Sequence, residues 1–156
     1  MRWLLIIWML FLCCDSSAQK KTSVTLPYQS KISSPKKSAV SHRKDVVELF
    51  KLIEKEIRNN SINGFRSSLG NTVYVTVLTS ESDYFSKNQA EAILSNFFSQ
   101  RKYVSFSFSR ISDQTTVPYA TGRYVYAARG NQETCQIYVS LSLQESRWVI
   151  TQFNIY

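Results

Sequence analysis

The clearest hydrophobic pattern in the chain lies between Asp83 and Gln100. Ser86 and Gln89 have the spacing of a capping box, in which each side chain bonds a free backbone N–H at the start of a helix. Apolar residues then recur on one helical face: Ala90, Ile93, Leu94, Phe97 and Phe98. The pattern predicts an amphipathic helix whose apolar face must be covered by the rest of the domain.

A second amphipathic helix is predicted from Lys44 to Asn60. Its apolar face is formed by Val46, Leu49, Phe50, Ile53 and Ile57. The opposite face is charged. Apolar residues at 62, 65 and 69 indicate a further short helical turn before the first strand.

Alternating apolar and polar positions, rich in β-branched and aromatic residues, predict about five strands. They span Thr72 to Thr79, Tyr103 to Arg110, Val117 to Ala128, Thr134 to Leu143 and Arg147 to Ile155. Short connectors join the last four, as in antiparallel hairpins. We therefore expect an α+β domain in which two to three N-terminal helices pack on a curved antiparallel sheet.

This order of elements resembles the cone-shaped nuclear-transport-factor-2-like fold over residues 44–156. The segments SKNQAEAILSNFF, YATGRY and WVITQFNI are similar to those of a family of small exported bacterial proteins with this fold and no assigned function. These motifs are packing and turn features, so the resemblance implies a fold and no activity. Gly122 in YATGRY is expected where the sheet bends or a helix approaches.

Residues 1–18 have the pattern of a cleaved secretory signal. Arg2 precedes the apolar run Trp3 to Leu12, and small residues at 16–18 predict cleavage before Gln19. The run is about half of the ~20 residues that span a bilayer, which argues against a permanent anchor. The sequence therefore predicts a bacterial protein exported to the periplasm or the extracellular space.

The three cysteines divide between this signal and the domain. Cys13 and Cys14 leave a lipoprotein as the alternative, although neither follows the small residue that lipidation requires. Cleavage would leave Cys135 as the remaining thiol, so no internal disulfide could form. Because Cys135 alternates with apolar residues, we expect it to be buried and inert rather than a nucleophile.

Residues 19–43 are predicted to be a disordered linker. The segment is rich in serine and lysine, has no acid and has no apolar period. It contributes much of the net charge of +8 and the pI of about 9.5. Two interpretations remain open: weak attraction to an anionic envelope surface, or a solubilising spacer without a partner. Nucleic-acid binding is not expected, because the basic residues are not interleaved with aromatics on a folded face.

Catalytic groups are scarce in the predicted domain. Enzymes with this cone fold use acids or histidines that project from strands into a pocket. Here each acid falls in a predicted helix, turn or strand end, and His42 falls in the predicted linker. We therefore expect no catalytic residue, no metal site and no cofactor.

Arg123 is the charged residue well inside a predicted strand, with Tyr119 and Thr121 on the same face. If that face lines the cone, Arg123 and Tyr119 could bind an anionic group. If it faces outward, Arg123 is solvated or paired across strands. Trp148 completes the candidate ligand-binding set. Further candidates for a pocket or a partner-binding sheet face are Tyr124, Tyr126 and Tyr138.

Two classes of function are favoured over the third alternative, an enzyme without a recognisable site. The first is a binding module that holds a small molecule or protein ligand in the cone or on the sheet face. The second is an envelope-associated, self-associating protein, with a homodimer as one form. A pocket predicts a cavity near Arg123 or Trp148, whereas self-association predicts a flat, exposed sheet face that carries the tyrosines.

Overall fold

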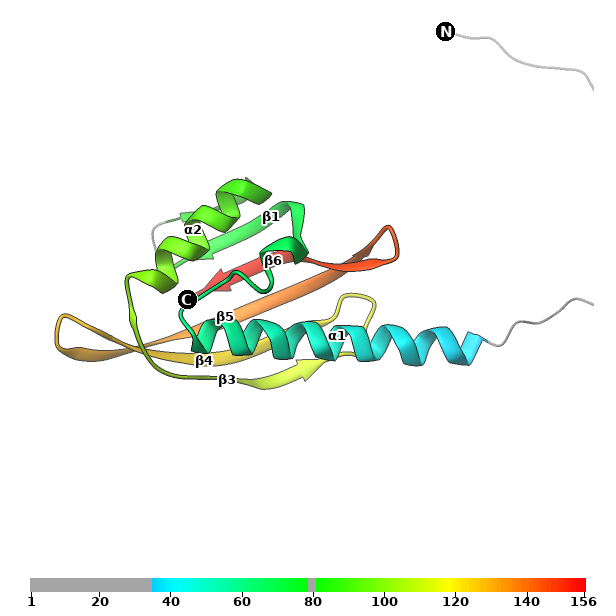
Figure 1. Cartoon of the computed structure of the whole chain (residues 1–156), viewed down its shortest axis with the longest axis horizontal. Helices are drawn as coiled ribbons and strands as arrows, with labels where there is room; N and C mark the ends of the chain where they lie inside the picture. The colour runs from blue at the N-terminus through cyan, green and yellow to red at the C-terminus, as the bar shows by residue number, and fades with distance from the viewer. Residues whose placement is uncertain (1–34, 79–80) are drawn as a thin grey trace, which may run out of the picture. The chain divides into compact units, whose positions relative to one another are not determined.

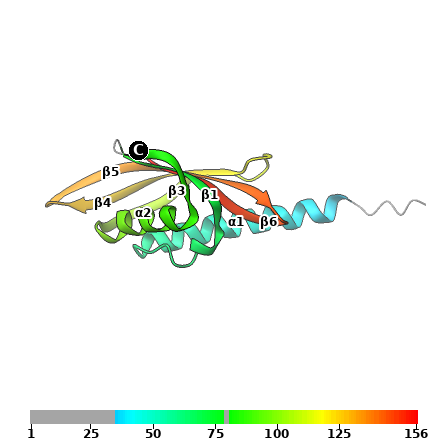
Figure 2. The same cartoon turned by 90° about the horizontal axis from the view of Figure 1, so that it is seen from above.

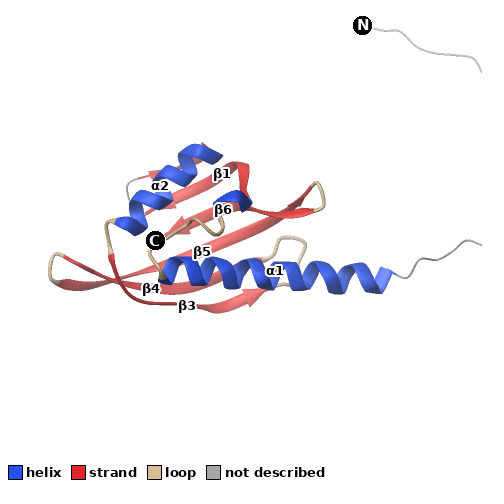
Figure 3. Cartoon of the chain, viewed as in Figure 1, coloured by secondary structure: helices blue, strands red, loops and turns tan. Residues whose placement is uncertain are grey.

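The computed structural model describes residues 35–78 and 81–156 (Figure 1). The predicted signal peptide and residues 19–34 of the predicted linker lie outside the described residues. The helical elements are α1 (Pro35–Arg58), the short 3-10 helix η1 (Arg66–Ser68) and α2 (Lys87–Ser99). The strands are β1 (Leu69–Val77), β2 (Glu81–Ser86), β3 (Lys102–Ser112), β4 (Tyr119–Ala128), β5 (Asn131–Gln144) and β6 (Arg147–Ile155) (Figure 3).

The strands form one sheet with the order β2-β1-β6-β5-β4-β3. Neighbouring strands are antiparallel except β1 and β6, which pair in parallel. The described part of the chain therefore has six strands rather than about five, and the sheet is mixed. The sequence pattern missed β2 because its residues ESDYFS do not alternate between apolar and polar. Pairing with β1 supplies the backbone hydrogen bonds that make this segment a strand.

Helix α1 begins nine residues earlier than the sequence pattern predicts. The linker prediction is therefore wrong for residues 35–43, which are helical. Pro35 suits the first helical position, where a missing N–H costs nothing. Tertiary contacts also hold this end: Arg43 Nε lies 2.6 Å from Asp113 Oδ2, and the His42 ring meets Trp148 edge-on at 6.4 Å. His42 thus belongs to the domain, contrary to the prediction.

Helix α2 follows the predicted pattern closely. Both halves of the capping box are present, since Ser86 bonds the backbone at Gln89 and the Gln89 side chain bonds the backbone N–H of Ser86. The buried side chains are Ala90, Leu94, Phe97 and Phe98. The amphipathic helix is confirmed, and its apolar face is covered by the sheet.

Both helices lie on the same face of a curved, unclosed sheet (Figure 2). α1 runs along β3 and α2 lies over β1, so the core fills the space between the helices and the sheet (Figure 1). Large, fully buried side chains come from every layer, including Phe50 of α1, Phe98 of α2, Tyr124 of β4 and Phe153 of β6. None of the helices in the described residues is long and apolar enough to cross a membrane.

Gly122 lies in β4 where β3 comes unusually close. A Cβ atom at this position would lie 2.4 Å from the carbonyl oxygen of Ser107 on β3. The register of β3 against β4 shifts between Phe108 and Arg110, directly beside this point. The neighbouring strand, rather than a helix, therefore requires the glycine.

Candidate functional site: the open sheet face

The candidate site is the face of the sheet turned away from α1 and α2, which we call the open sheet face (Figure 2). Strand alternation defines it: Tyr124 and Tyr126 of β4 are buried toward the helices, whereas Arg123 between them points the other way and is exposed. The strand register places four tyrosines and two arginines there, and the backbone hydrogen bonds between Tyr156 and Gln136 add a fifth tyrosine. These residues are Tyr74, Tyr84, Tyr119, Tyr138, Tyr156, Arg110 and Arg123.

The tyrosines of this face are held in pairs. Tyr119 and Tyr138 stack at 5.7 Å between ring centroids, with 21° between the ring planes. The Arg110 guanidinium carbon lies 5.8 Å from the centroid of the Tyr119 ring, a cation–π arrangement. Tyr74 and Tyr84 pack edge to face at 5.0 Å. These contacts fix rigid aromatic surfaces that retain solvent access, since Tyr84 is 71% exposed.

Arg123 lies on the open sheet face one strand in from the β3 edge, opposite Ser107 of β3 and Gln136 of β5. It borders an open depression of about 380 Å³ that is also lined by Ser109, Thr134, Gln136 and Tyr156. No ion pair involves Arg123 within residues 35–78 and 81–156. Its guanidinium donors are therefore available to a ligand.

Among the described side chains, register and alternation place no Asp or Glu on the open sheet face. Across the six strands, alternation and register place residues of these types there: serine, threonine, tyrosine, glutamine, asparagine, valine, alanine, arginine and lysine. Asp83 of β2 and Glu133 of β5 have the opposite phase and lie on the helix side of the sheet. The face is therefore aromatic and basic.

The predicted ligand-binding residues are only partly brought together. Arg123 and Tyr119 share the open sheet face, as their spacing indicates. Trp148 instead packs beside α1, next to His42, at a separate depression of about 320 Å³. Tyr124 and Tyr126 are buried in the core, whereas Tyr138 lies on the open face.

Sequence reasoning missed three tyrosines of this face. Tyr74 and Tyr84 face each other across β1 and β2, and the backbone of Tyr156 exchanges two hydrogen bonds with Gln136. The alternation of Val73 and Val75 with Tyr74 was the signal for the first of them. Tyr84 gave no such signal, because its strand was not predicted.

A polar cluster lies near the end of α2, on the helix side of the sheet and partly exposed. The Arg101 guanidinium carbon lies 3.7 Å from the centroid of the Phe97 ring, and Arg101 Nη1 donates to the Phe97 carbonyl at 2.8 Å. The Tyr126 hydroxyl donates to Glu133 Oε2 at 2.8 Å. Glu133 lies within β5, so the expectation that no strand interior carries a carboxylate is wrong for this residue.

Two groups beside this cluster keep their protons near neutral pH. Burial raises the pKa of the Cys135 thiol from 9.0 to about 12. Burial, followed by the nearby Cys135, raises the pKa of the Tyr124 hydroxyl from 10.0 to about 12. The prediction that Cys135 is buried is confirmed, and its protonated thiol is a poor nucleophile.

A family model described as "Domain of unknown function (DUF4783)" matches residues 50–156, more than half of the chain. The chain belongs to this family. Solved DUF4783 proteins include one from Bacteroides uniformis ATCC 8492, with 18% identity, a TM-score of 0.60 and coverage of 67% of this chain and 93% of that chain. One from Bacteroides fragilis YCH46 has 17% identity, a TM-score of 0.59 and the same coverage.

The DUF4783 domain of this chain has the nuclear-transport-factor-2-like fold, as the sequence predicts. A protein of that description and unknown function from Shewanella oneidensis MR-1 has 13% identity and a TM-score of 0.51, covering 72% of this chain and 96% of that chain. An epoxide hydrolase from M. tuberculosis has 9% identity, a TM-score of 0.56 and coverage of 72% and 82%. At these identities the likeness concerns the fold alone. No curated protein matches the chain.

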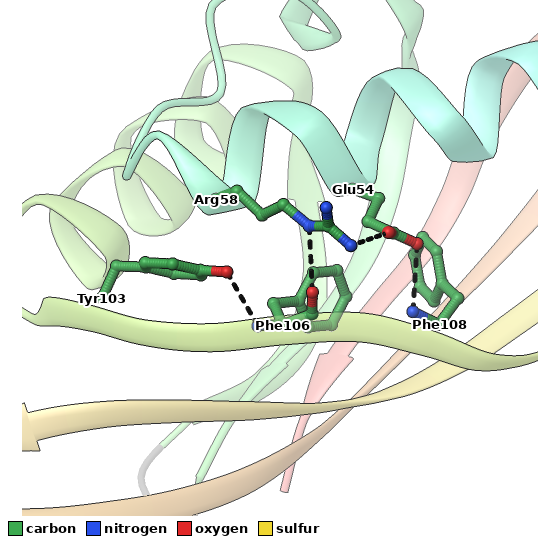
Figure 4. Close-up of polar contacts among 5 residues, drawn as sticks. All are labelled: Glu54, Arg58, Tyr103, Phe106 and Phe108. Atoms are coloured by element: carbon green, nitrogen blue, oxygen red, sulfur yellow. Dashed lines mark hydrogen bonds and ion pairs between the residues drawn. The ribbon is translucent and has the colours of Figure 1, made fainter.

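The edge strand β3 of the DUF4783 domain is covered by side chains of α1 (Figure 4). Arg58 Nε donates to the Phe106 carbonyl at 3.0 Å, and the Phe108 N–H donates to Glu54 Oε2 at 3.1 Å. Arg58 also pairs with Glu54. The Tyr103 hydroxyl accepts from the Phe106 N–H at 3.2 Å. These bonds satisfy backbone groups that an edge strand would otherwise present to another strand.

Proposed function

We propose that this domain is a non-catalytic binding module that docks a protein partner on its open sheet face. The observation that carries the proposal is the composition of that face, which combines five tyrosines and two arginines with no Asp or Glu among its described side chains. The cores of protein interfaces are enriched in tyrosine and arginine and depleted in aspartate and glutamate. The face thus has the composition of an interface.

The interior supports a protein partner over a small ligand held in the cone. Phe98 and Tyr124 are fully buried, and Phe97 is 3% exposed, so the region between α2 and the sheet is filled by aromatic rings. The rings contact one another directly, at 5.5 Å between Phe98 and Tyr124. A small molecule would have to displace this packing, whereas a protein can use a surface that is already exposed.

The non-catalytic assignment is supported by the state of the reactive groups. The Cys135 thiol is buried and holds its proton, and His42 packs against Trp148 at the far side of the sheet from Arg123. Within the described residues, no three histidine, cysteine, aspartate or glutamate side chains are grouped to hold a metal ion. Arginine and tyrosine bind and orient ligands but are weak acids and bases near neutral pH.

The proposal places this module outside the bacterial cytoplasm, on the evidence of the signal-like segment at residues 1–18. A partner would then be an exported or envelope protein. The basic segment before the domain would add weak attraction to anionic envelope surfaces.

Site-specific photocrosslinking in living cells tests the docking surface. A photoreactive benzoylphenylalanine replaces Tyr119 in the full chain, and in a matched variant it replaces Lys55, an exposed residue of α1. We expect a discrete adduct with another protein from position 119 and none from position 55. Adding Tyr138→Asp should abolish the adduct, because it removes one ring of the aromatic pair from the docking surface and puts a carboxylate there, while the unfolding midpoint stays close to that of the parent.

Three outcomes would overturn the proposal. Equal adducts from positions 119 and 55 would indicate unspecific contact. An adduct of twice the chain's mass would favour self-association instead. Turnover of a substrate that is lost on changing one residue of the domain would establish an enzyme.

A further inference from the structure

The charged side chains of the open sheet face form no ion pair within residues 35–78 and 81–156. Arg123 lies on β4, Arg110 lies on the edge strand β3, and the register places Lys102 on the same face at the start of β3. The nearest acids by sequence position are used elsewhere, since Asp113 pairs with Arg43 of α1 at 2.6 Å and Glu133 accepts from Tyr126. The face therefore presents positive charge that the domain itself does not neutralise.

The depression beside Arg123 suits a carboxylate group. The guanidinium has five N–H donors in a plane and binds a carboxylate through two parallel bonds. The hydroxyl of Thr134 and the amide of Gln136 line the same depression and add uncharged donors. The Ser109 hydroxyl, which also lines it, donates to the Thr121 carbonyl at 3.2 Å. With a volume of about 380 Å³, the depression can receive a side chain rather than a folded element.

The same charges disfavour a second copy of this chain as the occupant. In a symmetric dimer the same patch contributes from both subunits, so residues near the two-fold axis face their own copies. Two open sheet faces would bring arginines together with no Asp or Glu among the described side chains of the face to pair with them. Like charges placed together across an interface weaken the association.

We infer that the partner docked on the open sheet face is an acidic protein segment, one of whose Asp or Glu side chains binds Arg123 in this depression. The inference rests on the proposed function and specifies the chemistry of the partner. Charge complementarity selects an acidic segment, and the paired tyrosines supply the apolar contact around it.

Two synthetic peptides test the inference by nuclear magnetic resonance on the isotope-labelled full chain. One alternates Glu and Ser over twelve residues, and the other has Gln in place of every Glu. We expect only the Glu peptide to shift the backbone amides of Ser107, Arg123 and Gln136. Arg123→Gln should weaken its affinity about tenfold, as expected for one lost charge-assisted contact. The control Arg66→Gln, which changes an exposed arginine of η1, should leave the affinity unchanged.

The inference fails if both peptides bind equally, if neither binds, or if Arg123→Gln has no effect. It also fails if the Glu peptide shifts only amides of the basic segment before residue 35. These failures are separable from a failure of the proposed function. If the adduct from position 119 persists at full yield in an Arg123→Gln chain, docking on the open sheet face stands and the inference of an acidic partner fails.

Discussion

Glu54 of α1 accepts a hydrogen bond from the backbone N–H of Phe108 on the edge strand β3, at 3.1 Å. A carboxylate on a helix thus takes the position that a neighbouring strand's carbonyl would occupy. Arg58, one turn later, donates to the Phe106 carbonyl of the same edge. α1 therefore covers an eleven-residue edge strand as well as the core.

Glu54→Ala should expose this edge. The Phe108 N–H would lose its partner, at an expected cost of about 1 kcal/mol of unfolding free energy for one hydrogen bond. Amide hydrogen exchange should show faster exchange at Phe108, and urea unfolding should show the loss of stability. Glu48→Ala, at an exposed position on the same helix, is the matched control and should change neither. Unchanged exchange at Phe108 would mean that the bond does not protect the edge.

Phe98→Ala should be strongly destabilising. Phe98 is fully buried and contacts both Tyr124 and Phe153, so truncation leaves a large cavity in the core. We expect a loss of about 3 to 5 kcal/mol, a large part of a typical domain's stability. Urea unfolding measures it, with Ser95→Ala on the exposed face of α2 as the control. A loss below about 1 kcal/mol would contradict the central place of α2 in the core.

Stability should fall in alkaline solution. Burial raises the pKa of Cys135 from 9.0, and that of Tyr124 from 10.0, to about 12 in the folded chain. The folded state therefore holds these two protons more tightly than the unfolded chain. Their contribution to stability is present below about pH 9 and is lost as the pH rises from about 9 to 12.

Thermal unfolding midpoints across this pH range test the alkaline effect. Tyr124→Phe removes one of the groups whose pKa burial raises and should flatten the decline relative to the parent chain. Tyr84→Phe, which changes a tyrosine that is 71% exposed, should leave the decline unaltered. If all three chains lose stability with the same slope, the decline arises from other groups.

Export should be visible at the N-terminus of the protein in its native host. We expect mass spectrometry to find a chain that begins at or near Gln19, because small residues at 16–18 fit signal peptidase cleavage. A lipidated start at Cys13 or Cys14 would establish the lipoprotein alternative, and a chain that retains Met1 would refute cleavage.

The chain's local patterns were sufficient for most of the secondary structure and for one face of the sheet. Capping at Ser86 and the apolar spacing through Phe98 specify α2 because these interactions lie within one or two helical turns. Alternation likewise placed Tyr119 and Arg123 on one face, since side chains in a strand change sides at every residue. The family segments led to the correct fold.

Tertiary structure decided the features that depend on contacts between distant segments. The polar segment 81–86 is a strand only because β1 pairs with it, and residues 42 and 43 meet Trp148 and Asp113 far along the chain. The same holds for the side of the sheet to which Arg123 points. Alternation is symmetric between the two faces of a strand. Both helices lie on the side of Tyr124, which packs against Phe98 of α2, and this makes the face of Arg123 the open one.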